Sequence, residues 1–567
     1  MKKLFFAAMS LATIVSCSKN VDDASSVATA DGQAAFISVS LKAAGEMTRA
    51  NENLESFQYG STEENAIANA TFYFFDAAGN PYNVDTDNAV EVNTKTLTTT
   101  TNSGTPVNNI EAYSNVILVI KQSQNTPPAK MVALINVADP TDYADMTLAE
   151  LQDAASNYKT TNGFVMSNSV YEKNGAEVVA TEILPENIFT SPDPEGEVGD
   201  AYVAPENSGV KPVEIFVERV AAKVKVNVSN KIEGVLNVPA TDNTEAYTIY
   251  PVADVKDTYV KVRGWDVTNA AVESNLIKDY ATTTLFSPVN NAAFHRSYWA
   301  NTIASANPTH GFKFTDITKT VGSEAYYNEN TLTPTNAEGW YNANTISGAT
   351  KASQLIVAAQ LVDAEGKAKE FARWYGKDYE NGDALKANMI NNAAKQIFTK
   401  TTTTTGEGDE AVTETVLTGI TISDVTFYQC DPGDYVSTGD TYKGDRRYEV
   451  RVKAKDGVTY YHADGKTTYT ADEVTAILAN IEPAMIWAGG MTYYYTLINH
   501  YGDADGMVRN HIYDITISGF KGIGTPVYDP TKIIIPEVPV EQEAYHLTAQ
   551  INILSWALVS QNVELGF

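Results

Sequence analysis

The segment from Tyr545 to Ile553 (YHLTAQINI) alternates apolar and polar residues with a period of two. Successive side chains of an extended chain point to opposite faces of a sheet, so this pattern predicts a half-buried β-strand that needs a neighbouring strand. The alternation slips between Ile553 and Leu554, which predicts a bulge or bend before Trp556. The apolar face of the segment consists of Tyr545, Leu547, Ala549, Ile551 and Ile553.

The end of the chain, NVELGF, repeats the alternation with Val563, Leu565 and Phe567 on one face. Chain ends usually fray, so a terminal strand with three spaced apolar residues needs a partner. Two interpretations remain open: the strand pairs within its own sheet, or it is donated to another molecule. The proline-bearing segment from Thr525 to Glu543 favours donation, because such a linker would let the tail leave its own domain.

A similar strand is predicted near the other end, where FISVSLKA covers Phe36 to Ala43. Arg49 follows shortly after, beside the small residue Ala50, and the next arginine is Arg219. An isolated arginine at this place predicts that a trypsin-like protease cuts after Arg49. The cut would detach a strand rather than a loose tail. The apolar face of that strand consists of Ile37, Val39, Leu41 and Ala43.

The first residues are typical of an export signal. Lys2 and Lys3 precede an apolar run, Leu4 to Val15, that is too short to span a bilayer as a stable helix. The run ends in IVSC, which resembles a bacterial lipobox whose Cys17 is acylated by chains such as palmitate after cleavage before it. The alternative is an ordinary secretory signal with a chance cysteine. Acylation would leave Cys430 as the remaining cysteine, so no internal disulfide is expected.

Composition favours strands over helices, because Thr, Tyr, Val and Ile are abundant. About 550 residues follow the signal, enough for two or more domains with cores of their own. The formal net charge of −30 argues against nucleic acid as a partner, since phosphates would be repelled. A Pro-, Gly- and Glu-rich stretch at 190–212 predicts the approach to a domain boundary.

Periodicity and capping signals place the remaining elements. Asp383 is expected to cap a helix over Ala384 to Phe398. Capping boxes predict two more helices, from Thr147 to about Tyr158 and from Thr470 to about Asn480. Threonine tracts at 98–101 and 401–405 are expected in mobile tips or loops. Further strands are predicted at Ala70–Phe75, Asn115–Lys121, Lys130–Val137, Val224–Val228, Tyr259–Val262, Gln354–Val362, Val416–Phe427, Tyr448–Ala454 and Tyr513–Ile517.

No pattern points to catalysis, a cofactor or a metal ion. The six histidines lack metal-site spacing and are expected on strand or loop surfaces. Asp503, Asp505 and Gly506 resemble half of a calcium loop, but the flanking oxygen ligands are missing, so a tight turn is favoured. Carboxylates are too numerous for one acid–base pair to stand out. We therefore expect a protein that is not an enzyme.

The two end strands fit one scheme. Loss of the strand at 36–43 would leave a cleft with unpaired backbone groups, and the tail of another copy could fill it by strand addition. Burying about five to eight apolar side chains would contribute on the order of 10 kcal/mol before ordering costs. Donor and acceptor are different surfaces, so the contact is head-to-tail and would propagate as a filament.

Several stretches also resemble a known family, the fimbrillins of type V pili in Bacteroidota. They are the lipobox at Cys17, the TRA around Arg49, ENAIANATFYFFDAAG, KMVALINV, VERVA around Arg219, VRNHIYDI and INILSW. Within that family, the minor (short) fimbrium shaft subunits of Porphyromonas are the most similar. The resemblance implies a mainly β fold with two β-sandwich-like (transthyretin-like) domains and a few short helices.

It further implies a lipoprotein precursor at the outer membrane, an arginine-specific maturation protease, and a cell-surface fimbrium that supports adhesion and biofilm formation. The partners would be other copies of the chain, an anchor protein, and tip or accessory subunits. The implied division is a signal peptide (1–16), a lipidated propeptide (17–49), an N-terminal domain (50–212), a C-terminal domain (213–543) and a donor strand (544–567). The donor residues would be Ile551, Ile553, Trp556, Val563, Leu565 and Phe567.

Two other functions stay open. A tip or accessory fimbrillin would bind a surface ligand and is expected to lack a usable C-terminal donor strand. A glycan-binding or glycan-cleaving surface lipoprotein would keep its N-terminal strand and would present exposed aromatic side chains near carboxylates. The 32 tyrosines keep the last possibility open, although most are expected to face neighbouring strands.

Overall fold

The computed structural model gives a mainly β protein with a few short helices, as the sequence predicts. The predicted export signal, Cys17, Arg49 and Ala50 lie outside the described residues, as do Ile551, Ile553, Trp556 and Phe567. The structure describes residues 34–44, 58–84, 93–97, 110–121, 126–189, 213–242, 244–253, 255–280, 290–302, 311–332, 352–405, 412–430, 448–501, 504–534 and 557–566.

The first sheet is 9-stranded and has the order β13-β1-β14-β9-β5-β2-β3, with β12 also paired to β5 and β4 to β1. Apolar side chains of alternate residues fill one core on each of its two faces, as for Phe72 and Phe74 on one side and Tyr73 and Phe75 on the other. Its strands are β1 (Ala34–Ala44), β2 (Ala70–Phe75), β3 (Thr94–Leu97), β4 (Ile110–Lys121), β5 (Lys130–Ile135), β9 (Met166–Asn168), β12 (Thr181–Glu182), β13 (Ile188–Phe189) and β14 (Val213–Arg219).

The second sheet is 10-stranded, in the order β25-β15-β39-β17-β18-β26-β36-β40, with β16 also paired to β17 and β42 to β39. Trp265, Trp487 and Tyr513 are among the large side chains buried in its core. Its strands are β15 (Ala221–Val228), β16 (Leu236–Val238), β17 (Tyr247–Ala253), β18 (Tyr259–Thr268), β25 (Glu324–Asn328), β26 (Gln354–Val362), β36 (Met491–Leu497), β39 (His511–Lys521), β40 (Thr525–Pro526) and β42 (Ala557–Gly566).

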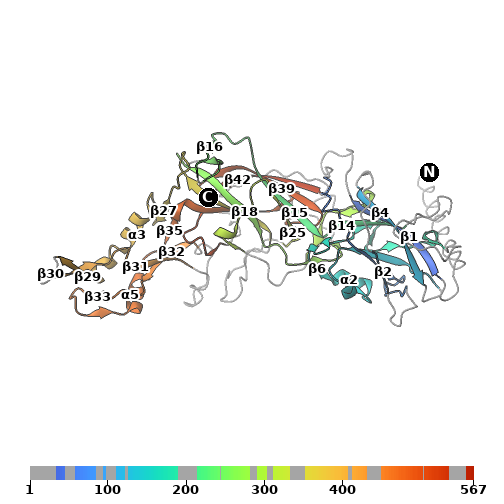
Figure 1. The fold of residues 1–567 in the computed structure, drawn as a ribbon, viewed down its shortest axis with the longest axis horizontal. Helices are drawn as coiled ribbons and strands as arrows, with labels where there is room; N and C mark the ends of the chain where they lie inside the picture. The colour runs from blue at the N-terminus through green and yellow to red at the C-terminus, as the bar shows by residue number, and fades with distance from the viewer. Residues whose placement is uncertain are drawn as a thin grey trace, which may run out of the picture.

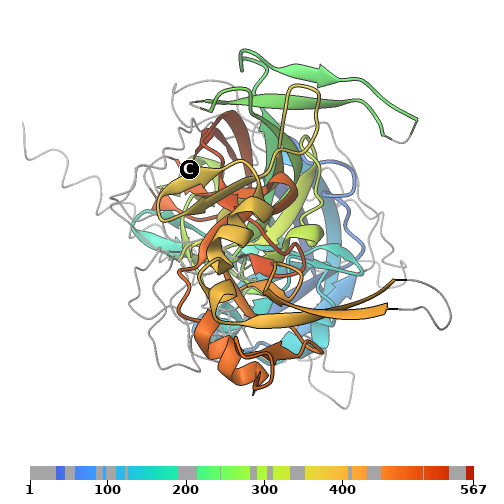
Figure 2. The same ribbon diagram turned by 90° about the vertical axis from the view of Figure 1, so that its left-hand side faces the viewer.

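A smaller unit is inserted between β26 and β36 and carries its own cores. Figure 1 shows it at the end of the elongated molecule opposite β1, and Figure 2 looks onto that end. Its strands are β27 (Phe371–Trp374), β28 (Lys377–Tyr379), β29 (Phe398–Thr405), β30 (Val412–Gly419), β31 (Val425–Gln429), β32 (Glu449–Ala454), β33 (Tyr460–Tyr461), β34 (Thr468–Tyr469) and β35 (Ala484–Trp487), and its helices are α3 (Gly382–Ile390) and α5 (Ala471–Leu478).

Short paired strands tie loops to these units. They are β6 (Ala155–Ser156) with β19 (Ser274–Asn275), β7 (Lys159–Thr160) with β8 (Gly163–Phe164), β10 (Tyr171–Lys173) with β11 (Ala176–Val178), β20 (Asp279–Tyr280) with β23 (Ala300–Asn301), β21 (Asn290–Asn291) with β22 (Arg296–Ser297), β24 (Phe312–Lys313) with β41 (Ile533–Ile534), and β37 (Asn499–His500) with β38 (Ala504–Asp505). A further helix, α2 (Leu148–Asp153), begins at the predicted capping box of Thr147 and Glu150.

Several local expectations were wrong. The helix expected over Ala384 to Phe398 ends at Ile390, and its cap is Asn381, whose side chain accepts hydrogen bonds from the backbone N–H groups of Asp383 and Ala384. The strand expected at Val416–Phe427 is two strands, β30 and β31, with a turn between them. The threonine tract at 401–405 lies in β29 and pairs residue by residue with β30.

The expected linker from Thr525 is a further error. β40 pairs with β36, β41 pairs with β24, and Val527 and Ile534 are buried. The first part of this segment is therefore docked on the body of the protein.

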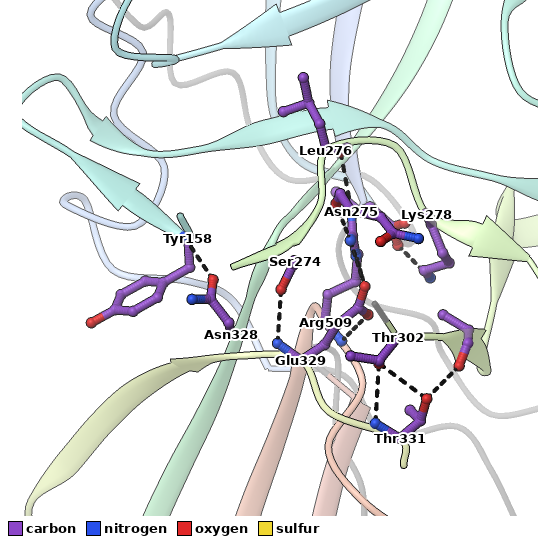
Figure 3. Close-up of polar contacts among 12 residues, drawn as sticks. Tyr158, Ser274, Asn275, Leu276, Lys278, Thr302, Asn328, Glu329, Thr331 and Arg509 are labelled. Carbon is purple, nitrogen blue, oxygen red and sulfur yellow. Dashed lines mark hydrogen bonds and ion pairs between the residues drawn. The ribbon is translucent and has the colours of Figure 1, made fainter. Parts of the chain in front are cut away.

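Buried ion pairs join the first two sheets, which meet at Val220. Lys278 Nζ lies 2.8 Å from Glu218 Oε2, and Arg509 Nε lies 3.0 Å from Glu329 Oε1. All four side chains are at most 2% exposed. Arg509 also donates to the carbonyl oxygens of Asn275 and Leu276, which completes the network in Figure 3. Each charge therefore has several partners, as a charge removed from water requires.

Arg219 makes a second link across the same junction. Its Nε donates to the carbonyl oxygen of Glu64 (2.9 Å), and its Nη1 donates to Asn510 Oδ1 (3.2 Å). The Glu64 carboxylate lies 3.1 Å from Lys223 Nζ and accepts a hydrogen bond from the Tyr326 hydroxyl. Although burial alone would raise it, the pKa of Glu64 is lowered by hydrogen bonds and these neighbouring cations. The junction is thus an ionic interface as well as a chain connection.

Two histidines are buried, His500 in β37 and His511 at the start of β39, contrary to the expectation that the histidines lie on the surface. His500 Nε2 donates to the carbonyl oxygen of Tyr298 (2.8 Å), and its Nδ1 accepts from the Tyr513 hydroxyl (2.8 Å). His511 Nδ1 donates to the carbonyl oxygen of Arg509, and the two imidazole centroids are 5.0 Å apart. Burial, with a smaller contribution from the nearby Lys278, lowers the pKa of His500 to about 3. Both rings are therefore neutral in the folded protein near pH 7.

The Arg509–Glu329 pair gives the first prediction. Glu329→Gln should lower the free energy of unfolding by about 3–5 kcal/mol, because Arg509 would stay buried without its counter-charge. Chemical denaturation of the full chain measures the change. Glu365→Gln, at an exposed position in a turn, is the control and should stay within about 0.5 kcal/mol of the parent. Equal stability of the two variants would show that the buried pair does not hold the junction.

The buried histidines give the second prediction. The pKa of His500 is lower in the folded than in the unfolded chain, where it is about 6.5. Its contribution to stability is therefore complete above that pH and is lost as pH falls toward the folded value of about 3. In denaturation series from pH 7.5 to 4, His500→Gln should show a weaker loss of stability with acid than the parent. His462→Gln, outside the cluster, should keep the parent's slope; an unchanged slope in His500→Gln would contradict the assignment.

Candidate strand-exchange site

Strand β1 lies inside the first sheet and is paired along both edges. One edge runs antiparallel to β4, from Ala34 opposite Lys121 to Ala43 opposite Ala112. The other edge pairs antiparallel with β13 through Phe36 and Ile37, and then parallel with β14 from Val39 to Ala43. Removal of β1 would therefore leave two facing rows of backbone N–H and C=O groups without partners, as well as a gap one strand wide.

The side chain of Ile37 shows how β1 contributes to the core. It is fully buried and belongs to the same cluster as Leu118, Ile188 and Ile215, which come from β4, β13 and β14. Val39 and Leu41 occupy the register positions opposite Val213 and Ile215 of β14. The predicted strand at 36–43 thus corresponds to β1, extended to Ala34–Ala44.

The C-terminal strand β42 lies in the second sheet of its own chain. It runs parallel to β39, from Ala557 opposite His511 to Gly566 opposite Lys521, with a bulge at Ile517–Gly519. Val563 lies opposite Ile517, and Leu565 lies opposite Phe520. The other edge of β39 pairs with β15 and β17. In this single chain the tail therefore covers the edge of β39, as the first of the two interpretations of the tail expects.

The two predicted end strands are thus not brought together within one molecule. β1 belongs to the first sheet and β42 to the second, and Figure 1 shows them far apart along the long axis. Sequence reasoning missed that β14, which the VEIFVER stretch forms, provides one wall of the gap. Its alternation was visible, but its partner depends on contacts far away in the sequence.

The described residues contain no group of three or more His, Cys, Asp or Glu side chains placed to hold a metal ion. Cys430 is buried and takes part in no disulfide there. In the same part of the chain, no helix combines the length and apolar character that a membrane crossing needs.

Comparison with known structures finds several similar chains, all at low identity. A cell adhesion protein from Parabacteroides distasonis is 11% identical, with 94% of this chain and 100% of that chain covered and a TM-score of 0.29. A fimbrial assembly protein from the same species is 13% identical (68% and 100% covered, TM-score 0.27). The tip fimbrial protein Mfa3 from Porphyromonas gingivalis is 9% identical (68% and 100%, TM-score 0.25). TM-scores at this level support no argument by themselves.

A comparison with curated protein sequences finds no match. Residues 486–562, however, match the family described as major fimbrial subunit protein type IV, fimbrillin, C-terminal. The matched region runs from β35 through β36, β39 and β40 into β42, so it covers both the tail and the strand on which the tail lies. By this match, residues 486–562 are similar to the C-terminal part of a major subunit protein of bacterial fimbriae.

Proposed function

We propose that this protein is a shaft subunit of a type V fimbria that polymerises by strand exchange. It is exported as a lipoprotein through Cys17, cut between Arg49 and Ala50, and then takes up the C-terminal strand of the next copy where β1 was. The position of β1 carries the proposal. It is an internal strand whose end, Ala44, comes shortly before the predicted cleavage site.

Cleavage after Arg49 would make the exchange of β1 for another strand possible. While β1 is covalently attached, it fills its place at a high effective concentration, and a strand from another molecule cannot compete. Once the connection is cut, the first sheet can exchange β1 for another strand. Without an occupant, the backbone groups of β4 and β14 and the core around Leu118 would be exposed to water, which is unfavourable.

The tail fits the gap in length. β1 spans 11 residues and β42 spans 10. Within its own chain, the tail pairs along one edge, with β39. In the place of β1 in another copy, it would pair along both edges, with β4 and β14. The additional row of backbone hydrogen bonds and the shared core favour transfer of the tail after cleavage.

The tail also has enough chain to reach a neighbour. The last residue described before the tail strand is Ile534, in β41. Residues 535–556 could span on the order of 70 Å when extended. Because β1 lies at one end of the molecule and β42 lies on the second sheet, well away from it (Figure 1), each copy would donate from one sheet and accept in the other. Such contacts do not close on themselves and give a linear polymer.

The finer assignments belong to the same proposal. The minor fimbrium of Porphyromonas is the system that the sequence most resembles, and an outer-membrane anchor, tip or accessory subunits and an arginine-specific protease are its expected partners. Domain limits near 212 and 543 are proposed with it. A tip or accessory role is the alternative, but a tip subunit needs no donor strand, and β42 is a regular strand of 10 residues.

Cleavage at Arg49 gives the third prediction. After incubation with an arginine-specific protease, the full-length protein should form heat-resistant ladders on a denaturing gel. Arg49→Ala should abolish the ladders and leave a folded monomer, because β1 would stay attached. As a control, Arg446→Lys together with Arg447→Lys removes two adjacent arginines elsewhere in the chain and should leave the ladders unchanged. Polymerisation of Arg49→Ala, or ladders from a chain lacking residues 557–567, would refute strand exchange.

A fourth prediction separates precursor from polymer. Ile37→Ala should lower the free energy of unfolding of the uncut chain by about 2–5 kcal/mol, because it leaves a cavity in the first core. The heat resistance of the assembled polymer should not change, since Ile37 is then absent. Leu118→Ala, in the adjacent strand that remains after cleavage, should weaken both forms. A polymer weakened by Ile37→Ala would mean that β1 is retained.

A further inference from the structure

A cavity of about 650 Å³ lies on the face of the first sheet opposite the core that holds Ile37. Val213, Ile215 and Val217 of β14 point into that core, whereas Glu214 and Phe216, between them in the sequence, line the cavity. The hairpin β10–β11 and the end of β9 form the other walls. Its volume falls within the usual range of about 300–1,000 Å³ for small-molecule sites.

The floor of the cavity is an aromatic platform. The Phe216 ring stacks on the His295 imidazole with a centroid distance of 3.5 Å and an interplanar angle of 8°. Tyr171 meets the imidazole edge-on, and its hydroxyl lies 3.0 Å from His295 Nδ1. Both partners of the stack line the cavity and are partly exposed. The cavity therefore has an aromatic part in an otherwise polar lining.

The platform is held in place by contacts between the two halves of the chain. The Ser169 hydroxyl donates to the carbonyl oxygen of His295 (2.5 Å), and the Ser297 hydroxyl donates to that of Val170 (2.7 Å). The backbone N–H of Glu172 donates to Asn290 Oδ1 (2.7 Å). His295 itself has φ = +52°, the left-handed conformation that costs energy for a residue with a side chain. The surrounding contacts hold the ring in this conformation before any ligand binds.

Charges of both signs surround the platform. Lys130 and Lys173 are the ammonium groups, and Glu177, Glu182 and Glu214 are the carboxylates. Within the described part of the chain, Lys173, Glu177 and Glu182 make no ion pair. The cavity thus offers strong hydrogen-bond donors and acceptors together. A phosphate or a metal ion would need a lining whose charges are mostly of one sign, and this lining carries both signs.

We propose that this cavity binds a short neutral saccharide. A sugar ring has an apolar C–H face, which can pack against the exposed part of the Phe216–His295 pair, and a rim of hydroxyl groups. Each hydroxyl can donate to a carboxylate and accept from an ammonium group, which matches the mixed rim. A lipid would leave the charged groups without partners, and an anion would be repelled by three carboxylates. The site goes beyond the proposed shaft function and gives the fimbrial protein a chemical class of adhesion target.

The site is tested on the uncut full-length chain, where Phe216 is opposite Lys42 of β1, so the result does not depend on polymerisation. The probes are lactose, chitobiose and maltotriose. Saturation-transfer NMR and calorimetry measure their binding. At least one of them should show saturable binding. His295→Asn should weaken it at least ten-fold, because asparagine accepts the left-handed conformation but has no ring.

Tyr375→Asn is the matched control, since Tyr375 is also left-handed (φ = +49°), is 73% exposed and lies in the distant small unit. It should bind the sugar like the parent. Lys173→Ala and Glu182→Gln change exposed rim residues and should weaken binding without lowering the unfolding midpoint, which separates loss of the site from misfolding. Absence of saturable binding to all three sugars, or equal affinity in parent, His295→Asn and the rim variants, would overturn the proposal.

Discussion

The double pairing of β1 is the interaction on which the rest of the structure depends. The loss of an edge strand breaks only one row of backbone hydrogen bonds, and water can replace these bonds. A strand paired on both edges and buried through Ile37 cannot be lost without opening the sheet between β4 and β14. The protein therefore folds around an N-terminal strand that the proposed cut after Arg49 would release. In that proposal, a stable precursor and an acceptor for another strand follow from the same arrangement.

The junction at Val220 decides whether the two sheets behave as one body. Lys278–Glu218 and Arg509–Glu329 are fully buried, and each charge is satisfied by partners that come from distant parts of the sequence. Buried ion pairs add little net stability over apolar packing, but breaking one is costly, so they tolerate few alternative arrangements. Together with β19 paired to β6, they restrict rotation about the chain connection. In the proposed filament, tension on a tail donated from the second sheet would then be transmitted to the acceptor in the first sheet.

The sequence predicts the elements whose signals are local. Alternation predicts β1, β2 and β26 closely, and the Thr147 and Thr470 capping boxes predict the beginnings of α2 and α5. It does not predict partners. The polar tract at 401–405 has no apolar face, yet it forms a strand because it pairs with β30. His500 can be buried because its two ring nitrogens form hydrogen bonds with Tyr513 and with Tyr298, which is distant in the sequence. For the candidate site, the end strands could be predicted, whereas the β13–β14 wall, the tail's place on β39 and the platform of Phe216 and His295 could not.

Strand β14 connects the proposed polymer contact with the proposed saccharide site. One of its edges faces the gap of β1, one of its faces packs into the first core, and its other face carries Glu214 and Phe216. Any strand that replaces β1 must form the same row of backbone hydrogen bonds, because only that pairing satisfies β14. The plane of β14, and with it the position of Phe216 under His295, is thereby kept in each copy. A filament built in this way would present the platform once per subunit, so that weak single contacts with a glycan-covered surface would add up along its length.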